Sequence, residues 1–489
     1  MQETSDPKAI SLMQLVRIAA ELLPAADRGP LSDAERKLLH AACELPAPDP
    51  EQVENIRAAI LAGRDPLGEA LSKLRTLSER RSLGQFWTPQ PIVDTMVEWV
   101  LAHSPAQVVD AGAGTGRFAA AVLRCNPRIP VHAVELDPVA SLLCRAHLAQ
   151  LPGEATVHCT DYLNWAPPVA DGPTAFLGNP PYVRHHALPS SVKAWLDLAQ
   201  LRLGRPVSKL AGLHAYFLIA TSFVSKPGDL ICFITSAEWL DVRYGEALRW
   251  LLLERLGLES LHLLTPEATA FPDAMTTAVI VCSRVGQQSS VVRVRRVEHV
   301  DAFTGLSTNG VDLARDTLAA ASRWSPLVIE PKITAHQKPV SQDDAVLPLG
   351  NIARVHRGIA TGANSFFVLS REEAEARGLL SYCVPCITRA EQILVADGLI
   401  TAQMVDEVLL LIPPTIPREQ LPQAVETYLR EGEEQGVHLR YLCRHRRPWW
   451  SLGRPKVPPI VMTYMARRPP AFALNPDGLV PLNIAHGIY

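Results

Sequence analysis

The chain has 489 residues, of which 47% are hydrophobic and 20% charged, and its formal net charge is −3. This composition is typical of a globular protein of roughly two or three domains, and it excludes a disordered or fibrous chain. A charge so close to zero also excludes a protein that is basic throughout, so any surface for nucleic acid has to be local.

Three further features bear on location. Nine cysteines are scattered without the spacing of a disulfide framework, which favours a reducing compartment. The first residues, "MQETSDPKAISLMQ", lack the basic and apolar regions of a signal peptide. No apolar run is long enough to span a bilayer. We therefore predict a cytoplasmic protein with no membrane partner.

Residues 1–80 are predicted to form a helical region. The segment "AISLMQLVRIAAELL" places apolar residues at helical spacing, and Ser32 with Glu35 forms a capping box before "RKLLHAACEL". A third helix is predicted over "LGEALSKLRTLSERR". No cluster of catalytic side chains is visible here, so we expect this region to serve as a packing or partner-binding helical cap.

Residues 81–300 alternate between short apolar strands and helices, which is the pattern of a parallel, doubly wound α/β sheet. The predicted strands are "AQVVDAG", "VHAVEL", "TAFLGN", "DLICFIT" and "TTAVIVC". A polar linker is predicted over 301–345, followed over 346–489 by a domain with short strands and many prolines.

A glycine loop follows the first strand, in "VVDAGAGTGRF". Gly112, Gly114 and Gly116 permit a tight turn and the close approach of a ligand to the backbone. Asp110 stands at the tip of the strand and suits a ligand with a cationic end, such as the ammonium and sulfonium groups of S-adenosyl-L-methionine. A nucleotide-binding loop of another kind is the alternative.

Two more acidic residues follow strands in the same way. Glu135 ends "VHAVEL", a position where a carboxylate accepts hydrogen bonds from ribose hydroxyls. Asp161, in "HCTDYLNW", could bind an adenine amino group with Tyr162 covering the ring, although a turn or helix cap explains Asp161 equally well. The ordered series indicates one cofactor site at the carboxyl ends of parallel strands.

The strand "TAFLGN" ends in the loop "NPPY". The lone pair of an amine such as that of adenine is conjugated with the ring, so the amine is a poor nucleophile. The side-chain oxygen of Asn179 and the carbonyl of Pro180 can hold its two N–H groups, which orients the lone pair and stabilises developing positive charge. Tyr182 can stack on the planar substrate. The alternative is a proline-rich turn beside a core tyrosine. No metal-ligand set is visible, so we expect no metal.

Together these motifs resemble those of the gamma-class, TaqI-like DNA adenine-N6 methyltransferases. The resemblance covers about residues 81–285 and rests on "LGQFWTPQPIVDTMVEWV", "DAGAGTGRF", "VELDP", "TDYLNW" and "GNPPY". It implies a Rossmann-like class I methyltransferase sheet that uses S-adenosyl-L-methionine, followed by a target-recognition domain. It also implies methyl transfer to N6 of an adenine flipped out of double-stranded DNA.

The resemblance assigns roles to individual residues. Thr88 and its neighbours would close over the methionine end of the cofactor, and Phe271, unless it is a core residue, would pack on the flipped adenine. The implied catalytic loop is Asn179, Pro180, Pro181 and Tyr182. The implied cofactor residues are Thr88, Asp110, Ala111, Gly112, Gly114, Glu135, Leu136, Asp161, Tyr162 and Asn179.

The last domain is predicted to contact DNA. Between Gln435 and Pro476 there are eight Arg or Lys residues and no Asp or Glu, with aromatic residues among them. This pattern is typical of phosphate contacts, although a solvated basic face has the same composition. The segment "RGIATGANSFF" resembles the start of the family's recognition domain. The predicted DNA-binding residues are Arg357, Arg446, Arg447, Trp449, Trp450, Arg454, Arg467 and Arg468.

Other functions remain as alternatives. Release-factor glutamine and rRNA guanine methyltransferases also use an NPPY loop, but they lack a long basic C-terminal domain. A non-catalytic DNA-binding subunit of a defence complex is a different class, and intact Asp110, Asn179 and Tyr182 argue against it. No nuclease constellation is visible, so a restriction endonuclease or another defence subunit would be a separate partner. The chain ends in "PLNIAHGIY", where relatives usually continue, which is consistent with an incomplete recognition domain.

Overall fold

The computed structural model divides into two compact units, Met1–Gln337 and Lys338–Tyr489. Within the parts of the chain that it describes, no helix is both long and apolar enough to cross a membrane. The described residues are 11–23, 29–76, 79–80, 83–265, 268, 277–300, 303–329, 349–464 and 470–489.

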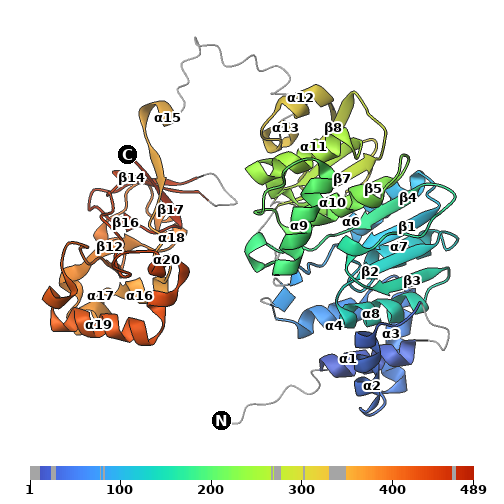
Figure 1. Cartoon of the computed structure of the whole chain (residues 1–489), viewed down its shortest axis with the longest axis horizontal. Helices are drawn as coiled ribbons and strands as arrows, with labels where there is room; N and C mark the ends of the chain where they lie inside the picture. Colours follow the sequence, from blue (N-terminus) through green and yellow to red (C-terminus); the bar gives the residue numbers. More distant parts are fainter. Residues whose placement is uncertain are drawn as a thin grey trace. The chain divides into compact units, whose positions relative to one another are not determined.

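The helical region at the N-terminus consists of α1 (Leu12–Leu22), α2 (Asp33–Cys43), α3 (Pro50–Leu61) and α4 (Pro66–Leu74). The predicted capping box is present, because Ser32 N donates to Glu35 Oε2 at 2.7 Å and Glu35 N donates to Ser32 Oγ at 3.2 Å. Glu35 is fully buried and pairs with Arg145 of α8 (Pro138–Ala149) at 2.8 Å. This ion pair ties the helical region to α8, against which it lies in Figure 1.

A nine-stranded sheet forms the centre of the first unit, in the order β3-β2-β1-β4-β5-β7-β6-β8-β9. Strands β3, β2, β1, β4 and β5 are parallel, so their carboxyl ends meet at one edge, and the predicted α/β class is confirmed. The strands are β1 (Gln107–Ala111), β2 (Val131–Glu135), β3 (Ala155–Cys159), β4 (Thr174–Gly178), β5 (Leu230–Ser236), β6 (Leu258–Leu264), β7 (Ala278–Arg284), β8 (Val291–Val297) and β9 (Val311–Ala314).

Beyond β5 the sheet differs from the uniformly parallel one that the sequence predicts. Strand β7 pairs antiparallel with β5 and β6, and β9 pairs antiparallel with β8. A buried apolar strand has the same pattern in either direction, so its orientation is not readable from its residues. The predicted linker also contains structure: β9, α12 (Arg315–Ala320) and α13 (Ser325–Ile329) lie in the first unit, where Leu313, Leu318 and Trp324 are buried.

Alternate residues of the strands face two separate cores. Val108 and Leu177 pack in one core, with α6 (Gln90–Ala102), α7 (Arg117–Cys125) and α8, whereas Val109 and Phe176 pack in the other. The second core is closed by α9 (Ser190–Leu203), α10 (Leu213–Val224) and α11 (Glu246–Glu254). Helices thus cover both faces of the sheet (Figure 1), and a ligand site is expected at the edge where the parallel strands end.

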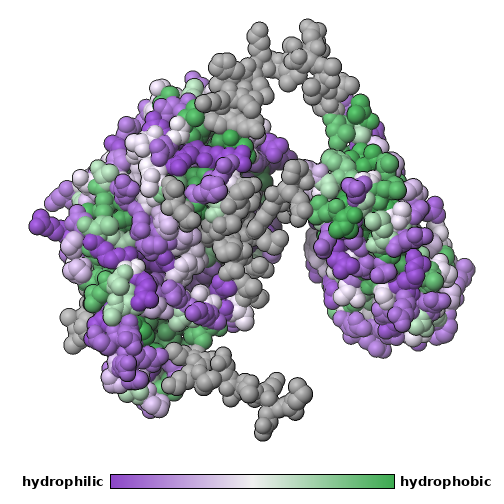
Figure 2. Space-filling model, turned by 180° about the vertical axis from the view of Figure 1, so that it is seen from behind, coloured by the Kyte–Doolittle hydropathy of each residue, from purple (hydrophilic) through white to green (hydrophobic). Residues whose placement is uncertain are grey.

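The second unit contains two four-stranded sheets, β10-β17-β14-β15 and β11-β13-β12-β16. Figure 2 shows hydrophobic residues gathered on part of its surface, and Ile352, Phe472 and Leu474 are among its exposed apolar side chains. Its strands are β10 (Val355–Arg357), β11 (Val368–Ser370), β12 (Cys383–Ile387), β13 (Glu407–Leu410), β14 (Ile460–Thr463), β15 (Phe472–Leu474), β16 (Val480–Pro481) and β17 (Ala485–Ile488). Its α-helices are α15 (Leu349–Ile352), α16 (Asn364–Phe367), α17 (Arg371–Ala376), α18 (Ala390–Leu394), α19 (Gln423–Glu434) and α20 (Tyr441–Arg444).

Candidate active site

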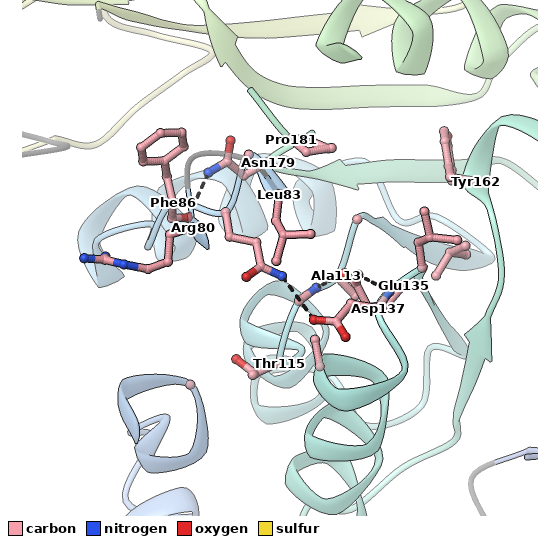
Figure 3. Close-up of a pocket in the computed structure, with 18 of the residues that line it drawn as sticks. Arg80, Leu83, Phe86, Ala113, Thr115, Glu135, Asp137, Tyr162, Asn179 and Pro181 are labelled. Carbon is pink, nitrogen blue, oxygen red and sulfur yellow. Dashed lines mark hydrogen bonds between the residues drawn. The ribbon is translucent and has the colours of Figure 1, made fainter. Parts of the chain in front are cut away.

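A cavity of about 490 Å³ lies at the carboxyl ends of the neighbouring parallel strands β3, β2, β1 and β4. In Figure 3, Asn179 and Pro181 lie on one side of this cavity, and Ala113, Glu135 and Asp137 lie on the other. The residues predicted from the sequence that line it are Thr88, Gly112, Gly114, Glu135, Leu136, Asp161, Tyr162, Asn179 and Pro181.

The glycine loop needs its glycines for two reasons. Gly112, Gly114 and Gly116 have φ values of +72°, +56° and +84°, a region that side chains with a Cβ rarely adopt. A Cβ on Gly116 would lie 2.7 Å from the sulfur of Cys144, which is closer than real Cβ contacts come. The resulting turn lines the cavity with residues that have little or no side chain, so a ligand can approach the backbone closely.

Glu135 joins the glycine loop to the next strand. Its Oε2 accepts a hydrogen bond from Gly114 N at 2.7 Å, and its Oε1 accepts one from Asp137 N at 2.9 Å. Each carboxylate oxygen retains a further lone pair that can accept from a ligand hydroxyl. The next residue, Leu136, is 67% exposed and presents an apolar side chain at the same wall.

Asp110 lies behind the glycine loop and is not part of the cavity wall. Its carboxyl is fully buried, Oδ2 accepts from Ala119 N at 2.9 Å, and Oδ1 has no partner among the described residues. Burial raises the pKa of Asp110 to about 7, with the nearby charge of Glu135 adding to the effect and the Ala119 bond opposing it. The side chain therefore anchors the first turn of α7. Ala111 is also buried outside the wall.

Asp161 acts as a helix cap and also lines the cavity. Its Oδ1 accepts a hydrogen bond from Leu163 N at 3.0 Å, which is the helix cap named as the alternative. The same residue also lines the cavity. Tyr162 lies flat against Phe217, with ring centroids 4.7 Å apart, and its hydroxyl lies 2.8 Å from Thr221 Oγ1. Because α10 holds the tyrosine on both its face and its hydroxyl, the ring is a fixed wall for a planar ligand.

Asn179 follows β4 directly and is oriented by residues 86–88 of a segment that lines the cavity beside it. Its Nδ2 donates to Thr88 Oγ1 at 3.1 Å and to the Phe86 carbonyl at 3.4 Å. Its Oδ1 is buried and has no hydrogen-bond partner within the described ranges. A buried acceptor without a partner is costly in a native protein, so this oxygen is a candidate contact for a substrate donor.

The rest of the NPPY loop is held by the same segment. Tyr182 N donates to the Gly84 carbonyl at 3.2 Å, and a Cβ on Gly84 would lie 2.6 Å from that nitrogen. The ring of Tyr182 contacts those of Phe86 and His214, with centroids at 5.5 Å and 6.2 Å. These contacts fix the plane of the tyrosine ring, while Pro181 lines the cofactor-sized cavity.

The helical region contributes to this cavity, which the sequence does not predict. Arg75 pairs with Asp137 at 2.5 Å and also donates to Gln85 Oε1 at 2.6 Å, so a chain of polar contacts crosses from α4 to the loop after β2. The only local signal in the sequence is Gly68, a glycine early in α4. A Cβ at this position would lie 2.7 Å from the ring of Trp87, so a side chain does not fit there. The lining residues from the region predicted to be helical, residues 1–80, are Gly68, Leu71, Ser72, Arg75 and Arg80.

Trp449 and Trp450, predicted on a DNA-binding surface, lie against the core of the second unit instead. Trp450 is 6% exposed, and the indole N–H of Trp449 is bonded to a glutamate of α19. Packing large aromatic rings against the core stabilises a small domain more than exposing them would. This explains why the buried Trp450 and the half-buried Trp449 face the core and not a DNA surface. Arg446 also has a structural role, because it donates to the carbonyls of Ala360 and Thr361 at 2.6 Å each.

Three of the other predicted arginines are described by the structure, and all three are exposed. Arg357, Arg447 and Arg454 face solvent and stay candidates for phosphate contacts. Arg440, directly before α20, and Arg444, its last residue, are also exposed. Neither is among the DNA-binding residues predicted from the sequence. Three predicted residues lie outside the described residues: Phe271, Arg467 and Arg468.

Two models of known protein families match this chain. The model described as "Eco57I restriction-modification methylase" matches residues 174–271, which include the NPPY loop. The model described as "Type II methyltransferase M.Eco57I, C-terminal domain" matches residues 321–489. The two matches therefore include the NPPY loop and the whole of the second unit.

Individual relatives extend this likeness to nearly the whole chain. Type II methyltransferase M.XamI of Xanthomonas campestris pv. amaranthicola is 38% identical over 490 residues, covering 97% of this chain and 88% of the relative. Type II methyltransferase M.AccI of Acinetobacter calcoaceticus is 24% identical, covering 85% of this chain and 77% of the relative. The Type IIL restriction-modification enzyme MmeI, solved with DNA, shares the fold with a TM-score of 0.56 at 13% identity, covering 98% of this chain and 74% of that one. The chain belongs to the type II DNA methyltransferases of restriction-modification systems.

Proposed function

We propose that this chain transfers a methyl group from S-adenosyl-L-methionine to N6 of an adenine flipped out of double-stranded DNA at a specific sequence. The observation that carries the choice of acceptor is the buried, oriented carbonyl of Asn179 beside the cavity. An exocyclic amine offers N–H donors to such an oxygen, whereas a ring carbon offers none. The site therefore favours methylation of an amine.

The cavity suits the proposed cofactor in volume and in chemistry. About 490 Å³ is within the usual range for small-molecule sites. Glu135 and Asp161 provide carboxylate oxygens for ribose hydroxyls and the adenine amino group, while Leu136 and Tyr162 provide apolar walls for the ring. Asp110 provides negative charge behind the glycine loop for the cationic end. When bound, the cofactor supplies an electrophilic methyl group.

In the proposed reaction the NPPY loop holds the acceptor amine. Asn179 Oδ1 accepts one N–H and the Pro180 carbonyl accepts the other, so the nitrogen lone pair points away from both oxygens and toward the cavity. The same two oxygens stabilise the positive charge that develops on the nitrogen as the new bond forms. Orientation and electrostatic stabilisation are sufficient here, and the residues need not remove the proton before transfer. As the N–CH₃ bond forms, the S–CH₃ bond of the cofactor would break and leave a neutral thioether, and the methylated nitrogen would then lose one proton to water.

The cost of extruding the base sets a requirement for stacking. Flipping costs a few kcal/mol of lost stacking and pairing, and each base–aromatic stack contributes roughly 1–3 kcal/mol. Tyr182, fixed by Phe86 and His214, supplies one ring. Phe271, which lies outside the described residues, is proposed as the second.

Double-stranded DNA is the proposed macromolecular partner. Exposed Arg357, Arg447 and Arg454 of the second unit are the proposed phosphate contacts, together with Arg440 and Arg444. The relatives' membership in restriction-modification systems leads us to propose that a separate endonuclease cleaves DNA that this chain has left unmethylated.

Transfer from a cofactor with a labelled methyl group tests this proposal. The wild-type chain should label duplex DNA, and Asn179→Ala should lose that label while its affinity for the cofactor, measured by calorimetry, stays within about twofold. Near-normal DNA labelling by Asn179→Ala would exclude the catalytic role of the loop. Labelling of a release factor or of ribosomal RNA, with DNA unlabelled, would instead support the alternative enzymes.

A further inference from the structure

We propose that the Thr88 hydroxyl is a positioning group that holds the Asn179 amide in its reactive orientation. This inference rests on the proposed function and deepens it, because it reassigns a residue expected to bind the cofactor. Thr88 does line the cavity, but its one recorded hydrogen bond in the described structure is to Asn179 Nδ2, at 3.1 Å.

The surroundings permit one orientation of the amide. Asn179 Nδ2 lies 3.4 Å from the Phe86 carbonyl, and a carbonyl oxygen only accepts hydrogen bonds, so the NH₂ must face it (Figure 3). The same NH₂ makes the shorter bond to Thr88, which is 4% exposed, so bulk water is not available to take the place of its hydroxyl. Both bonds leave Oδ1 as the atom that faces an acceptor amine.

The orienting segment is built against the NPPY loop along its length. Residues 84–88 contact the loop at three places: Gly84 O accepts from Tyr182 N, the Phe86 ring contacts the Tyr182 ring, and Thr88 holds Asn179. Gly84 has a φ of +66° and passes too close to Tyr182 for any side chain. This close fit makes a chance contact between Thr88 and Asn179 a poor explanation.

The orientation matters because an amide is not symmetric. A half-turn about the terminal torsion of Asn179 would present NH₂ to the N–H groups of the acceptor, which loses a hydrogen bond and adds repulsion. That torsion is broad and roughly two-fold, so the environment alone chooses between the two orientations. The longer Phe86 contact would remain without Thr88, so a partial loss of rate is expected rather than a complete one.

The test compares two substitutions with a matched control. Thr88→Val replaces the hydroxyl with a methyl group of similar shape, and Thr88→Ser retains the hydroxyl. Thr95 is equally buried at 4% and bonds to the carbonyls of Pro91 and Phe303, outside the cavity wall, so Thr95→Val is the control. If valine at position 88 prevents folding, Thr88→Ala removes the same hydroxyl without adding bulk.

Single-turnover methyl transfer at saturating DNA and cofactor is measured beside the dissociation constant of the cofactor. Thr88→Val should slow transfer roughly tenfold, which is the size of one neutral hydrogen bond, and should change cofactor affinity by less than about twofold. Thr88→Ser should restore most of the rate, and Thr95→Val should lower thermal stability without slowing transfer.

Three results in the Thr88 variants would overturn the inference without contradicting the proposed function. Weaker cofactor binding by Thr88→Val with an unchanged rate at saturation would make Thr88 a cofactor ligand. Equal losses in the valine and serine variants would assign the effect to packing. Wild-type kinetics in Thr88→Val would mean that the bond does not matter. A wild-type chain that transfers nothing to DNA would contradict the proposed function, and this inference with it.

Discussion

Cofactor binding is predicted to release a proton, because of where Asp110 lies. Burial raises the pKa of its carboxyl to about 7, so the group is half protonated near neutral pH. A bound ligand with an ammonium or sulfonium group near Oδ1 favours the carboxylate and returns this pKa toward its ordinary range. Affinity should then rise with pH, by about tenfold between pH 6 and pH 8, with about half a proton released per ligand at pH 7.

Calorimetry in two buffers of different ionisation enthalpy measures this release directly. S-adenosyl-L-methionine is titrated into the full chain at pH 6, 7 and 8, and the difference in heat between buffers gives the number of protons released. Asp110→Asn should bind more weakly at pH 8 and should abolish the proton release. Asp171→Asn, which changes an exposed carboxylate outside the cavity wall, is the matched control and should behave as the wild type.

The sign of the effect is the critical result. Affinity that is constant from pH 6 to pH 8, or that falls as pH rises, would refute an electrostatic interaction between the buried Asp110 carboxyl and a cationic ligand. Proton release that persists in Asp110→Asn would assign the linkage to another group. Asp110 would then serve only as an anchor for the first turn of α7 through Ala119.

Four further perturbations follow from the structure. Glu35→Ala leaves the buried Arg145 guanidinium without its partner and should lower the free energy of unfolding by about 3–5 kcal/mol, measured by denaturant titration. Arg446→Ala should lower the stability of the chain by about 1–3 kcal/mol because two buried bonds to a loop are lost, with DNA binding weakened only through that change. Exposed Arg447→Ala should leave stability unchanged and reduce the slope of log K against log salt by about 0.9, and an unchanged slope would exclude it from the DNA surface. Tyr182→Ala should slow methylation of a paired adenine more than of an adenine opposite a gap, and equal slowing would contradict its stacking role.

The positions of the predicted cofactor and catalytic groups could be read from the sequence because each is marked locally. Glu135 ends β2, Asn179 directly follows β4, and Asp110 stands one residue before the end of β1, with glycines or prolines close by in the sequence. Parallel strands bring such ends to one edge whatever the details of packing, so a pattern of a few residues was enough to predict that they lie together.

Features that depend on distant packing were not readable in this way. The direction of β7 and the contribution of α4 to the cavity wall come from contacts between segments far apart in the chain. Trp449 and Trp450 stand among arginines in the sequence, yet their rings turn into the core of the second unit. Composition identifies a basic and aromatic segment but does not say which of its side chains face solvent.

The central claim is that the Asn179 carbonyl accepts a hydrogen bond from the amine of adenine, and the methylated nucleoside tests it most directly. Duplex DNA treated with the full chain and a cofactor carrying a labelled methyl group is digested to nucleosides and analysed by mass spectrometry. The account predicts labelled N6-methyldeoxyadenosine as the product, absent when Asn179→Ala replaces the wild type. Label on N4 or on C5 of cytosine would contradict it, because the methyl acceptor would then not be the amine of adenine.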